Sequence, residues 1–460
     1  MAYYAKQAAQ NADRLDAVIE HTMDEQIASL VEQIKIPSEK KESEGKYPFG
    51  EAMQRSLDHA LALGRKMGFS TRDLDGYAGV IEYGEGEETL GVLAHLDVVP
   101  AGTGWSVDPF GGEIKDGFIY GRGTSDDKGP AIHALYALNA IRECGIKLQK
   151  KVQIILGCDE ESGWACMDHF KKVEKMPDVA FSPDAEYPLV HSEMAIVHAT
   201  YRAKTGGSKL RLHCGGRANV VPGEATAVVY CDVPKMSLPE GFELKKEADG
   251  DMVKLTVKGL GAHASLPDNG KNALQMLIRI LYGLALEPED QKLVSALFEA
   301  FQMDKHGETL GLDAQDESGR LTLNPGVLNW TEEEAVLEID SRVPHCEKGR
   351  HVIDKILEKL GAAGFELVTS NVKEGLFVPT DSPLVQSLMG VYQAHTGDMD
   401  AKPLAIGGGT YARAMPVAVA FGCEFEGDPG LAHMPDERIP LERLRVNTKI
   451  LADAIIALAE

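Results

Sequence analysis

Three short apolar runs that end at polar residues restrict the fold of this chain more than any other feature. The runs cover residues 90–94, 152–156 and 179–181. Continuous apolar runs of this length are typical of strands buried on both faces of a parallel sheet. Because parallel strands end at one edge of a sheet, we expect the polar residues that follow them to converge. These residues are His95-Leu96-Asp97, Asp159-Glu160-Glu161 and Asp184.

Helix and strand patterns alternate along the first part of the chain. Apolar residues recur at helical spacing in residues 24–35, 51–67 and 129–144, and strand-like runs lie between these ranges. This alternation predicts an α/β domain with helices on both faces of its sheet. Ligands of such domains bind beyond the carboxyl ends of the strands, where the polar residues named above are found.

The pattern changes after Glu186. Residues 187–380 contain several strand-like runs and three helical ranges, which predicts an α+β unit. From about Ser382 the α/β pattern returns, so the first domain is expected to be discontinuous. We therefore predict residues 1–186 and 381–460 as two parts of one domain, with residues 187–380 inserted between them.

The composition limits the partners of the chain. A net charge of −24 over 460 residues argues against nucleic acid, because phosphate binding needs a basic face. The first residues lack the basic and apolar regions of a secretory signal, and no run approaches the ~18 apolar residues of a membrane span. We expect a cytoplasmic protein with neither a nucleic-acid nor a membrane partner.

A further polar cluster follows a predicted hairpin at residues 113–120. It runs from Gly121 to Gly129 and contains Asp126-Asp127-Lys128. Together with His95-Leu96-Asp97 it is similar to the core of the M20 family of metallopeptidases, and residues 123–130 resemble its PepV-type dipeptidase branch. The likeness continues in the family's order over nearly the whole chain, in residues 159–164, 182–186, 261–263, 407–411 and 432–437.

The resemblance implies a discontinuous two-metal aminopeptidase-like catalytic domain with an inserted α+β lid domain. It also implies two divalent metal ions, with Zn²⁺ as the first choice and Mn²⁺ or Co²⁺ as alternatives. A pair of ions needs a bridging carboxylate together with further oxygen and nitrogen donors. In this family the bond after the bridging aspartate is cis, which we expect here before Asp127. The implied ligands are His95 and Asp184 for one ion, Glu161 and His433 for the other, and Asp126 for both.

Two further acidic residues have roles implied by the resemblance. Asp97 lies on the same side of its strand as His95 and can accept the free N–H of the imidazole. Glu160 resembles the general base that takes a proton from the attacking water and passes it to the leaving amine. The alternative for Glu160 is a solvated acidic turn, which fits poorly with its position directly after a buried strand.

The inserted domain contributes three candidate substrate-binding residues. His263, in Gly261-Ala262-His263, resembles the family's lid histidine that polarises the scissile carbonyl. Asn219 and Arg342 resemble the residues that hold the carbonyl and the carboxylate of the substrate, and Arg offers a two-pronged fork for the latter. A surface salt bridge is the alternative for Arg342.

These features predict a metal-dependent dipeptidase that acts on small peptides with a free amino terminus. An N-acyl amino acid deacylase of the same family is the alternative, because it shares every metal motif and differs in the pocket for the amine side. A catalytically silent binding protein is disfavoured, since no implied ligand is missing. Members with this larger insert differ from dimeric relatives, which implies a monomer whose lid supplies His263 in cis.

Overall fold

The chain divides into two units, each with its own sheet and apolar core. The computed structural model describes residues 6–43 and 45–460. Unit 1 comprises the chain up to His191 together with Val378–Leu404 and Thr410–Glu460, and unit 2 comprises Ser192–Phe377 and Ala405–Gly409. Residues 1–5, part of the stretch in which we expect no secretory signal, lie outside the described residues.

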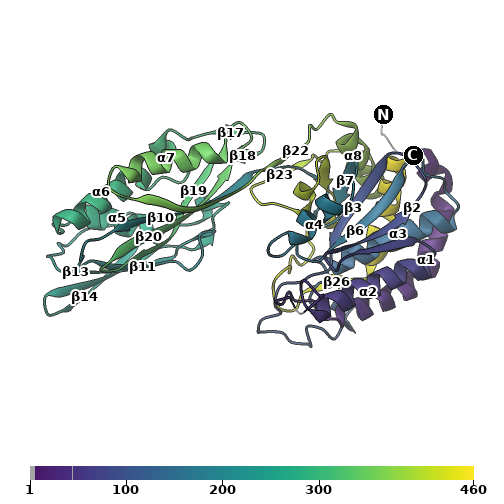
Figure 1. Ribbon diagram of the computed structural model, residues 1–460, viewed down its shortest axis with the longest axis horizontal. Helices are drawn as coiled ribbons and strands as arrows, with labels where there is room; N and C mark the ends of the chain where they lie inside the picture. The colour runs from purple at the N-terminus through teal and green to yellow at the C-terminus, as the bar shows by residue number, and fades with distance from the viewer. Residues whose placement is uncertain (1–5, 44) are drawn as a thin grey trace. The chain divides into compact units, whose positions relative to one another are not determined.

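Unit 1 is built on a mixed sheet with a parallel centre. The strand order is β1-β2-β6-β3-β7-β24-β9, and the neighbours from β6 to β24 are parallel. Val92 of β3 pairs with Ile154 of β6 and Phe181 of β7, so the three predicted apolar strands are confirmed as neighbours. Figure 1 shows them at the centre of this unit. The bounds are β1 Ser70–Leu74, β2 Ala78–Tyr83, β3 Thr89–His95, β6 Lys151–Gly157, β7 Val179–Ser182, β9 Val190–Glu193 and β24 Ala418–Ala420.

Among the described residues, six α-helices belong to this unit. Helices α2 and α4 pack against β2, whereas α3 and α9 pack against β3 and β6. Helix α1 packs on α3 and α9. In α2 the buried side chains Met53, Leu57 and Leu61 recur at helical spacing, which explains why this segment folds as a helix against the sheet. The bounds are α1 Lys6–Ile34, α2 Glu51–Lys66, α3 Lys128–Glu143, α4 Ala165–Val173, α8 Pro383–Thr396 and α9 Leu441–Ala459.

A small antiparallel sheet connects two distant parts of unit 1. The predicted hairpin forms from β4 (Glu113–Lys115) and β5 (Phe118–Tyr120), and β26 (Arg438–Pro440) pairs with β5. Two short strands, β8 (Ala185–Glu186) and β25 (Cys423–Glu424), also pair. The loop after β5 and the segment before β26 are therefore neighbours.

Unit 2 is an eight-stranded antiparallel sheet with three helices. The strand order is β14-β15-β13-β11-β19-β20-β10-β21. Helix α5 packs on β13, β15 and β19, and α7 packs on β10 and β21 (Figure 1). The bounds are β10 Ala195–Lys204, β11 Arg211–Cys214, β13 Glu224–Val229, β14 Glu243–Asp249, β15 Met252–Lys258, α5 Ala273–Tyr282, α6 Pro288–Phe301, β19 Thr322–Trp330, β20 Glu334–Val343, α7 Gly349–Gly361 and β21 Glu366–Lys373.

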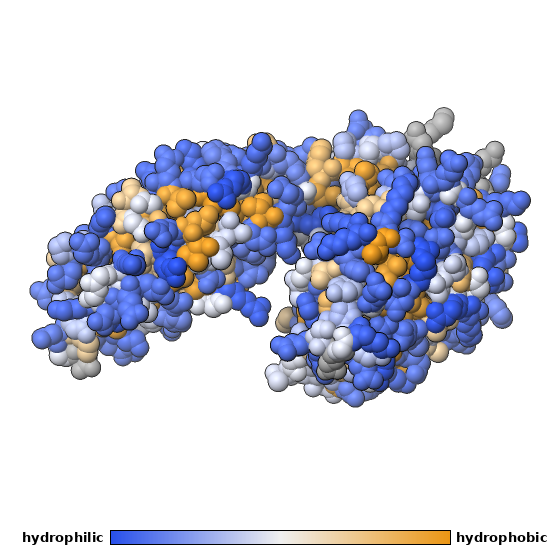
Figure 2. Space-filling view, viewed as in Figure 1, coloured by the Kyte–Doolittle hydropathy of each residue, from blue (hydrophilic) through white to orange (hydrophobic). Residues whose placement is uncertain are grey.

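Several short strands also form pairs. Strands β22 (Leu376–Phe377) and β23 (Leu404–Ile406) pair with β9, and β17 (Gln315–Asp316) pairs with β18 (Gly319–Arg320). The face seen in Figure 2 is largely hydrophilic, with hydrophobic side chains in scattered groups. Among the described residues, no helix combines the length and the apolar character needed to cross a membrane.

Candidate metal centre

The candidate metal ligands of unit 1 lie at strand ends and in loops that meet at one edge of the sheet. His95 ends β3, Glu161 follows β6 and Asp184 follows β7, and these three strands are parallel neighbours. Asp126 lies in the loop between β5 and α3, and His433 precedes β26. The pairing of β26 with β5 brings these two segments to the same place.

Asp126 presents its two carboxylate oxygens to two different histidines. Oδ1 lies 3.0 Å from Nε2 of His95, and Oδ2 lies 2.9 Å from Nε2 of His433. Asp184 Oδ2 is 3.7 Å from the same nitrogen of His95, and Glu161 Oε1 is 3.1 Å from that of His433. The five side chains thus form two groups that share Asp126.

The other ring nitrogen of His95 fixes its tautomer. Nδ1 lies 2.9 Å from the main-chain oxygen of Asp97 and 3.5 Å from the Asp97 carboxylate. A carbonyl oxygen can only accept, so Nδ1 donates and the neutral ring keeps a lone pair on Nε2. The hydrogen bond of His95 Nδ1 therefore goes to the carbonyl oxygen of Asp97, and the Asp97 carboxylate, which the sequence predicts as the acceptor, lies farther away.

The carboxylate of Asp97 has a different set of partners. Its Oδ1 and Oδ2 accept the backbone N–H groups of Glu160 and Glu161, each at 3.0 Å. Asp97 is 1% exposed, so these charge-assisted hydrogen bonds are shielded from water. Asp97 thereby holds the turn that carries both glutamates.

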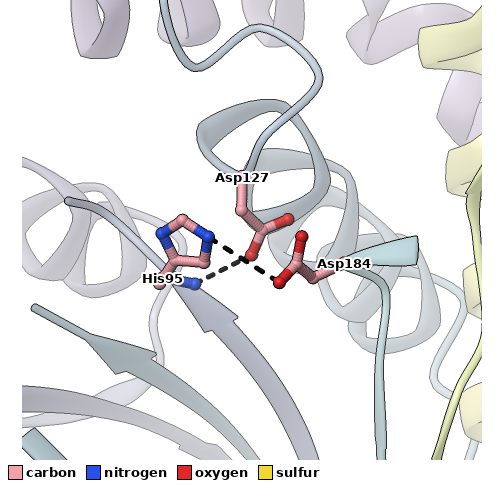
Figure 3. Close-up of side chains that lie close together, drawn as sticks. All are labelled: His95, Asp127 and Asp184. Atoms are coloured by element: carbon pink, nitrogen blue, oxygen red, sulfur yellow. Dashed lines mark hydrogen bonds and ion pairs between the residues drawn. The ribbon is translucent and has the colours of Figure 1, made fainter. Parts of the chain in front are cut away.

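Asp127 belongs to the cluster although the sequence analysis gave its side chain no role. Its Oδ2 accepts the backbone N–H of His95 at 2.8 Å, and Figure 3 shows it facing His95 and Asp184. Ligand atoms of these three residues lie within 4.8 Å of one another. Its Oδ1 is buried and has no hydrogen-bond partner among the described residues. The peptide bond between Asp126 and Asp127 is cis, as predicted.

Burial in this acidic cluster raises the pKa of several carboxyl groups. The pKa of Glu160 is raised to about 7, mainly by burial and further by the charges of Glu161 and Asp97. The pKa of Asp184 lies well above its ordinary value, again through burial first and then through Asp127. Nearby positive charge favours the ionised form of a carboxyl group. The donor set therefore fits divalent cations, which would supply that charge.

Neighbouring carboxylates raise the pKa of both histidines of the cluster. The pKa of His433 is raised to about 10 by its hydrogen bonds to Asp126 and Glu161. Burial alone would lower the pKa of His95, but its hydrogen bonds to Asp126 and Asp97 raise it well above its ordinary value. Protons on these rings partly balance the carboxylates that a metal ion would otherwise neutralise.

Asn219 and His263 are neighbours within unit 2. Strand β12 (Val220–Val221) pairs with β16 (Ala262–His263), and Ala264 donates its N–H to the carbonyl oxygen of Asn219 at 3.0 Å. Nδ1 of His263 lies 2.6 Å from Oγ of Ser265 and accepts the Ser265 N–H at 3.2 Å. The pKa of His263 is lowered, first by burial and then by Arg342. The neutral ring therefore carries its proton on Nε2.

Arg342 is buried, at 4% exposure, so the alternative of a surface salt bridge is wrong. Its Nε and Nη2 donate to the two oxygens of Asp340, each at 3.0 Å. Its Nη1 donates to the carbonyl of Gly407 at 3.0 Å, and His198 contacts Asp340 at 2.8 Å. A guanidinium has five N–H groups, so two remain beyond these three bonds.

Comparison with known proteins identifies the family. The sequence profile described as Peptidase family M20/M25/M40 matches residues 91–457. The chain belongs to this family. It is 38% identical over 431 residues to YtjP of Bacillus subtilis (strain 168), covering 90% of this chain and 92% of YtjP. It is 34% identical over 430 residues to the Beta-Ala-Xaa dipeptidase of Lactobacillus delbrueckii subsp. lactis, covering 90% of this chain and 91% of the relative.

A solved structure supports the fold of this M20 peptidase. Human carnosine dipeptidase 1 superposes with a TM-score of 0.58 at 16% identity, over 98% of this chain and 99% of that protein. At this identity the likeness shows the fold alone. Family membership makes the chain a metallopeptidase, a hydrolase that acts on peptide bonds.

Two buried carboxylates outside the predicted set hold the loops of the M20 site. Asp159 accepts hydrogen bonds from Lys40 at 2.6 Å, from the Ser162 hydroxyl at 2.5 Å and from the Ala165 N–H at 2.9 Å, which fixes the turn after β6. Glu437 bonds the loop that carries Asp126. Their positions in the family motifs were visible in the sequence, but their partners were not.

Proposed function

We propose that this M20 peptidase is a metal-dependent dipeptidase that cleaves the peptide bond of dipeptides with a free amino terminus. The observation that carries the proposal is the position of Asp126, whose oxygens face Nε2 of His95 at 3.0 Å and Nε2 of His433 at 2.9 Å. A carboxylate placed between two imidazoles could bridge a pair of ions that each bind one of these imidazoles. A relative of nearly equal length is named Beta-Ala-Xaa dipeptidase, which supports the substrate class.

Five side chains would hold the two ions. His95 and Asp184 would bind one, Glu161 and His433 the other, and Asp126 both. The neutral His95 ring, whose Nδ1 donates to a carbonyl, would offer the lone pair of Nε2 to a cation, and the unpartnered Oδ1 of Asp127 also supports a bound cation. Histidine and carboxylate donors suit Zn²⁺, Mn²⁺ or Co²⁺. When bound, the ions supply the Lewis acidity that activates a water and polarises a carbonyl.

Glu160 is proposed as the general base. Its backbone is fixed by Asp97, while the described residues give its carboxylate no hydrogen bond. Its pKa of about 7 in the metal-free chain, raised mainly by burial, reflects the cost of a charge in this position. Cations nearby would keep the group ionised and able to take a proton from the attacking water. The same carboxyl group then passes this proton to the leaving amine.

The three candidate residues of unit 2 are proposed to bind the substrate. His263 would donate its Nε2–H to the carbonyl oxygen as negative charge develops there. Asn219 would hold the same substrate carbonyl. Its own backbone carbonyl accepts the N–H of Ala264, the residue that follows His263. Arg342 would use its two remaining N–H groups for the substrate carboxylate, with Asp340 holding its guanidinium in place.

A substrate panel with metal removal tests this function. Unmodified dipeptides, including β-alanyl dipeptides, are compared with N-acyl amino acids of the same side chains. We expect dipeptides to be preferred by kcat/KM, and activity to be lost with a chelator and restored by Zn²⁺, Mn²⁺ or Co²⁺. A preference for N-acyl amino acids would favour the deacylase. Absence of turnover on both classes after metal is restored would indicate a binding protein.

A further inference from the structure

Two loops of the candidate metal centre are joined by a buried contact that the proposed mechanism does not use. The pairing of Arg438 in β26 with Tyr120 in β5 sets the segment after His433 beside the loop that leads to Asp126. The carbonyl of Glu437 accepts the N–H of Gly121 at 2.9 Å at the end of this pairing. The side chain of Glu437 then points into the loop.

The Glu437 carboxylate fills a nest of backbone donors. Its Oε1 accepts the N–H groups of Gly123 at 3.0 Å, Ser125 at 3.0 Å and Asp126 at 3.3 Å. The Ser125 hydroxyl is 3.2 Å from the same oxygen. Glu437 is 0% exposed, so water cannot replace these bonds. One carboxylate oxygen thus fixes the backbone up to and including Asp126.

Arg122 balances the charge of Glu437. Its Nη1 donates to Oε2 of Glu437 at 2.5 Å, and Arg122 is 1% exposed. The guanidinium also lies over the ring of Trp105, 5.3 Å from its centroid. A buried carboxylate without such a partner would be strongly destabilising. Glu437 and Arg122 therefore form a buried contact in which one oxygen of the carboxylate faces the guanidinium and the other faces the loop N–H groups.

The loop that leads to Asp126 needs this constraint because its glycine allows more backbone conformations than other residues do. Gly123 has a φ of +92°, a conformation that glycine adopts readily and other residues rarely do. Glycine also gives the unfolded loop more conformational entropy, which is lost when the loop folds. Without the carboxylate, the N–H groups of Gly123, Ser125 and Asp126 would lose their acceptor, which would destabilise this conformation of the loop.

We propose that Glu437 and Arg122 form a positioning pair that holds Asp126 at its place between His95 and His433. Glu437 follows His433 by four residues, so the same pair ties the two loops that carry two of the five candidate ligands. The inference rests on the proposed function in one respect, that Asp126 is a metal ligand. Neither residue of the pair touches the substrate or the reacting atoms.

Cobalt binding by the full chain tests the proposal. The variant Glu437→Gln keeps an oxygen for the loop N–H groups but turns an N–H group toward Arg122. We expect the dissociation constant for Co²⁺ to rise by about ten- to hundredfold, the range found when an orienting partner of a metal ligand is removed. The visible spectrum of bound Co²⁺ should also change, because it reports the geometry of the ligands. Excess Co²⁺ should restore part of the activity.

Two further variants separate positioning from folding. Asp453→Asn weakens the partly buried contact between Asp453 of α9 and His395 of α8, which lies outside both loops, and should leave Co²⁺ affinity within about twofold of wild type. Arg122→Lys keeps the charge and loses the planar fork, so the chain should fold and bind Co²⁺ more weakly than wild type. This variant decides the question if Glu437→Gln does not fold.

The outcomes distinguish this inference from the proposed function. If wild type binds two Co²⁺ ions and the folded Glu437→Gln or Arg122→Lys variant binds them equally well with an unchanged spectrum, the positioning role is wrong. An equal loss of affinity in Asp453→Asn would also overturn it, because the effect would then be general destabilisation. If wild type itself binds no Co²⁺ at the cluster, the proposed function fails first.

Discussion

Glu160 differs from Asp97, Asp126 and Asp159 because its carboxylate has no hydrogen bond among the described residues. Asp97, Asp126 and Asp159 all accept hydrogen bonds that fix their orientation. A general base has to be ionised and free to reach a water, and a fixed carboxylate serves to orient other groups. This contrast supports the proposal that Glu160 transfers the proton and that the other three carboxylates orient their neighbours.

Replacing Glu160 with Gln should therefore remove turnover and leave the metals in place. The amide keeps the shape of the side chain but cannot take a proton, so we expect kcat to fall by about 10²–10⁴. Steady-state kinetics together with metal analysis of the purified variant measure both effects. Glu113→Gln, on the exposed hairpin, serves as the control. A variant that kept more than about a tenth of wild-type kcat would rule out the base role.

Metal affinity should rise with pH. Below a pKa of about 10 the metal-free His433 holds a proton, and metal binding must release it. The apparent dissociation constant for Zn²⁺ should therefore decrease as pH increases from 6 to 8, by up to about tenfold per unit for each proton released. Calorimetry in buffers of different ionisation enthalpy counts these protons. A dissociation constant that did not change with pH would contradict the protonated state of the cluster.

The sequence indicates candidate metal ligands more readily than the residues that hold them in place. His95, Asp126 and His433 stand in motifs whose residue types already indicate metal binding. Glu437 and Asp127 could not be assigned in the same way, because their carboxylates accept backbone N–H groups. Any residue type can donate such a bond, and Glu437 and Gly123 are 314 positions apart in the chain. Only the fold brings these groups together.

Some secondary structure elements are likewise easier to predict from the sequence than others. The strands β3, β6 and β7 were predicted because continuous apolar runs have few alternatives. Strand β14 is an edge strand with three Lys or Glu residues in its first four, and β19 contains Pro325 and Gly326, so neither resembles a strand in sequence. Segments of this kind become strands because they pair with neighbouring strands in the sheet. Strand β10 alternates buried and less buried residues and could have been found from that period.

The loop that carries Asn219 depends on two buried amides that the sequence does not reveal. Asn324 donates to the carbonyls of Ala218 at 2.8 Å and Val220 at 3.0 Å, and Asn272 donates to Asn324 at 3.0 Å. These bonds fix the backbone on both sides of Asn219. They therefore also fix β12, which pairs with the strand that ends at His263.

Removing the imidazole of His263 tests the proposed role of this side chain in the reaction. We expect His263→Ala to lower kcat by about 10²–10³, the effect of losing one donor to a developing oxyanion, with both metals retained. The matched control is His213→Ala, which removes an exposed histidine of β11 in the same unit. Kinetics at saturating metal measure the difference. An unchanged kcat would exclude a part for His263 in the reaction.

At the scale of the whole molecule, the candidate residues belong to two units of one chain. The metal cluster lies in unit 1, whereas Asn219, His263 and Arg342 lie in unit 2. Residues 187–380 are therefore proposed as a lid that closes over the metals and supplies His263 in cis. Closure would exclude water and strengthen each charge interaction in the site.

If the lid of each chain acts on the metals of the same chain, the enzyme should be active as a monomer. Turnover per chain should stay constant when the enzyme is diluted through the nanomolar range at saturating metal. Mixing the chain that lacks the base (Glu160→Gln) with the chain that lacks the lid imidazole (His263→Ala) should restore no activity, since each chain uses its own histidine. Activity that falls on dilution, or that returns on mixing, would show that His263 acts across a subunit boundary.

Anomalous diffraction from crystals grown with Zn²⁺ would show whether Asp126 lies between two divalent ions. We expect two peaks about 3.5–4 Å apart, one beside His95 and Asp184 and one beside Glu161 and His433, with an oxygen of Asp126 on each. A single peak, or two peaks that leave Asp126 without a metal, would contradict this expectation.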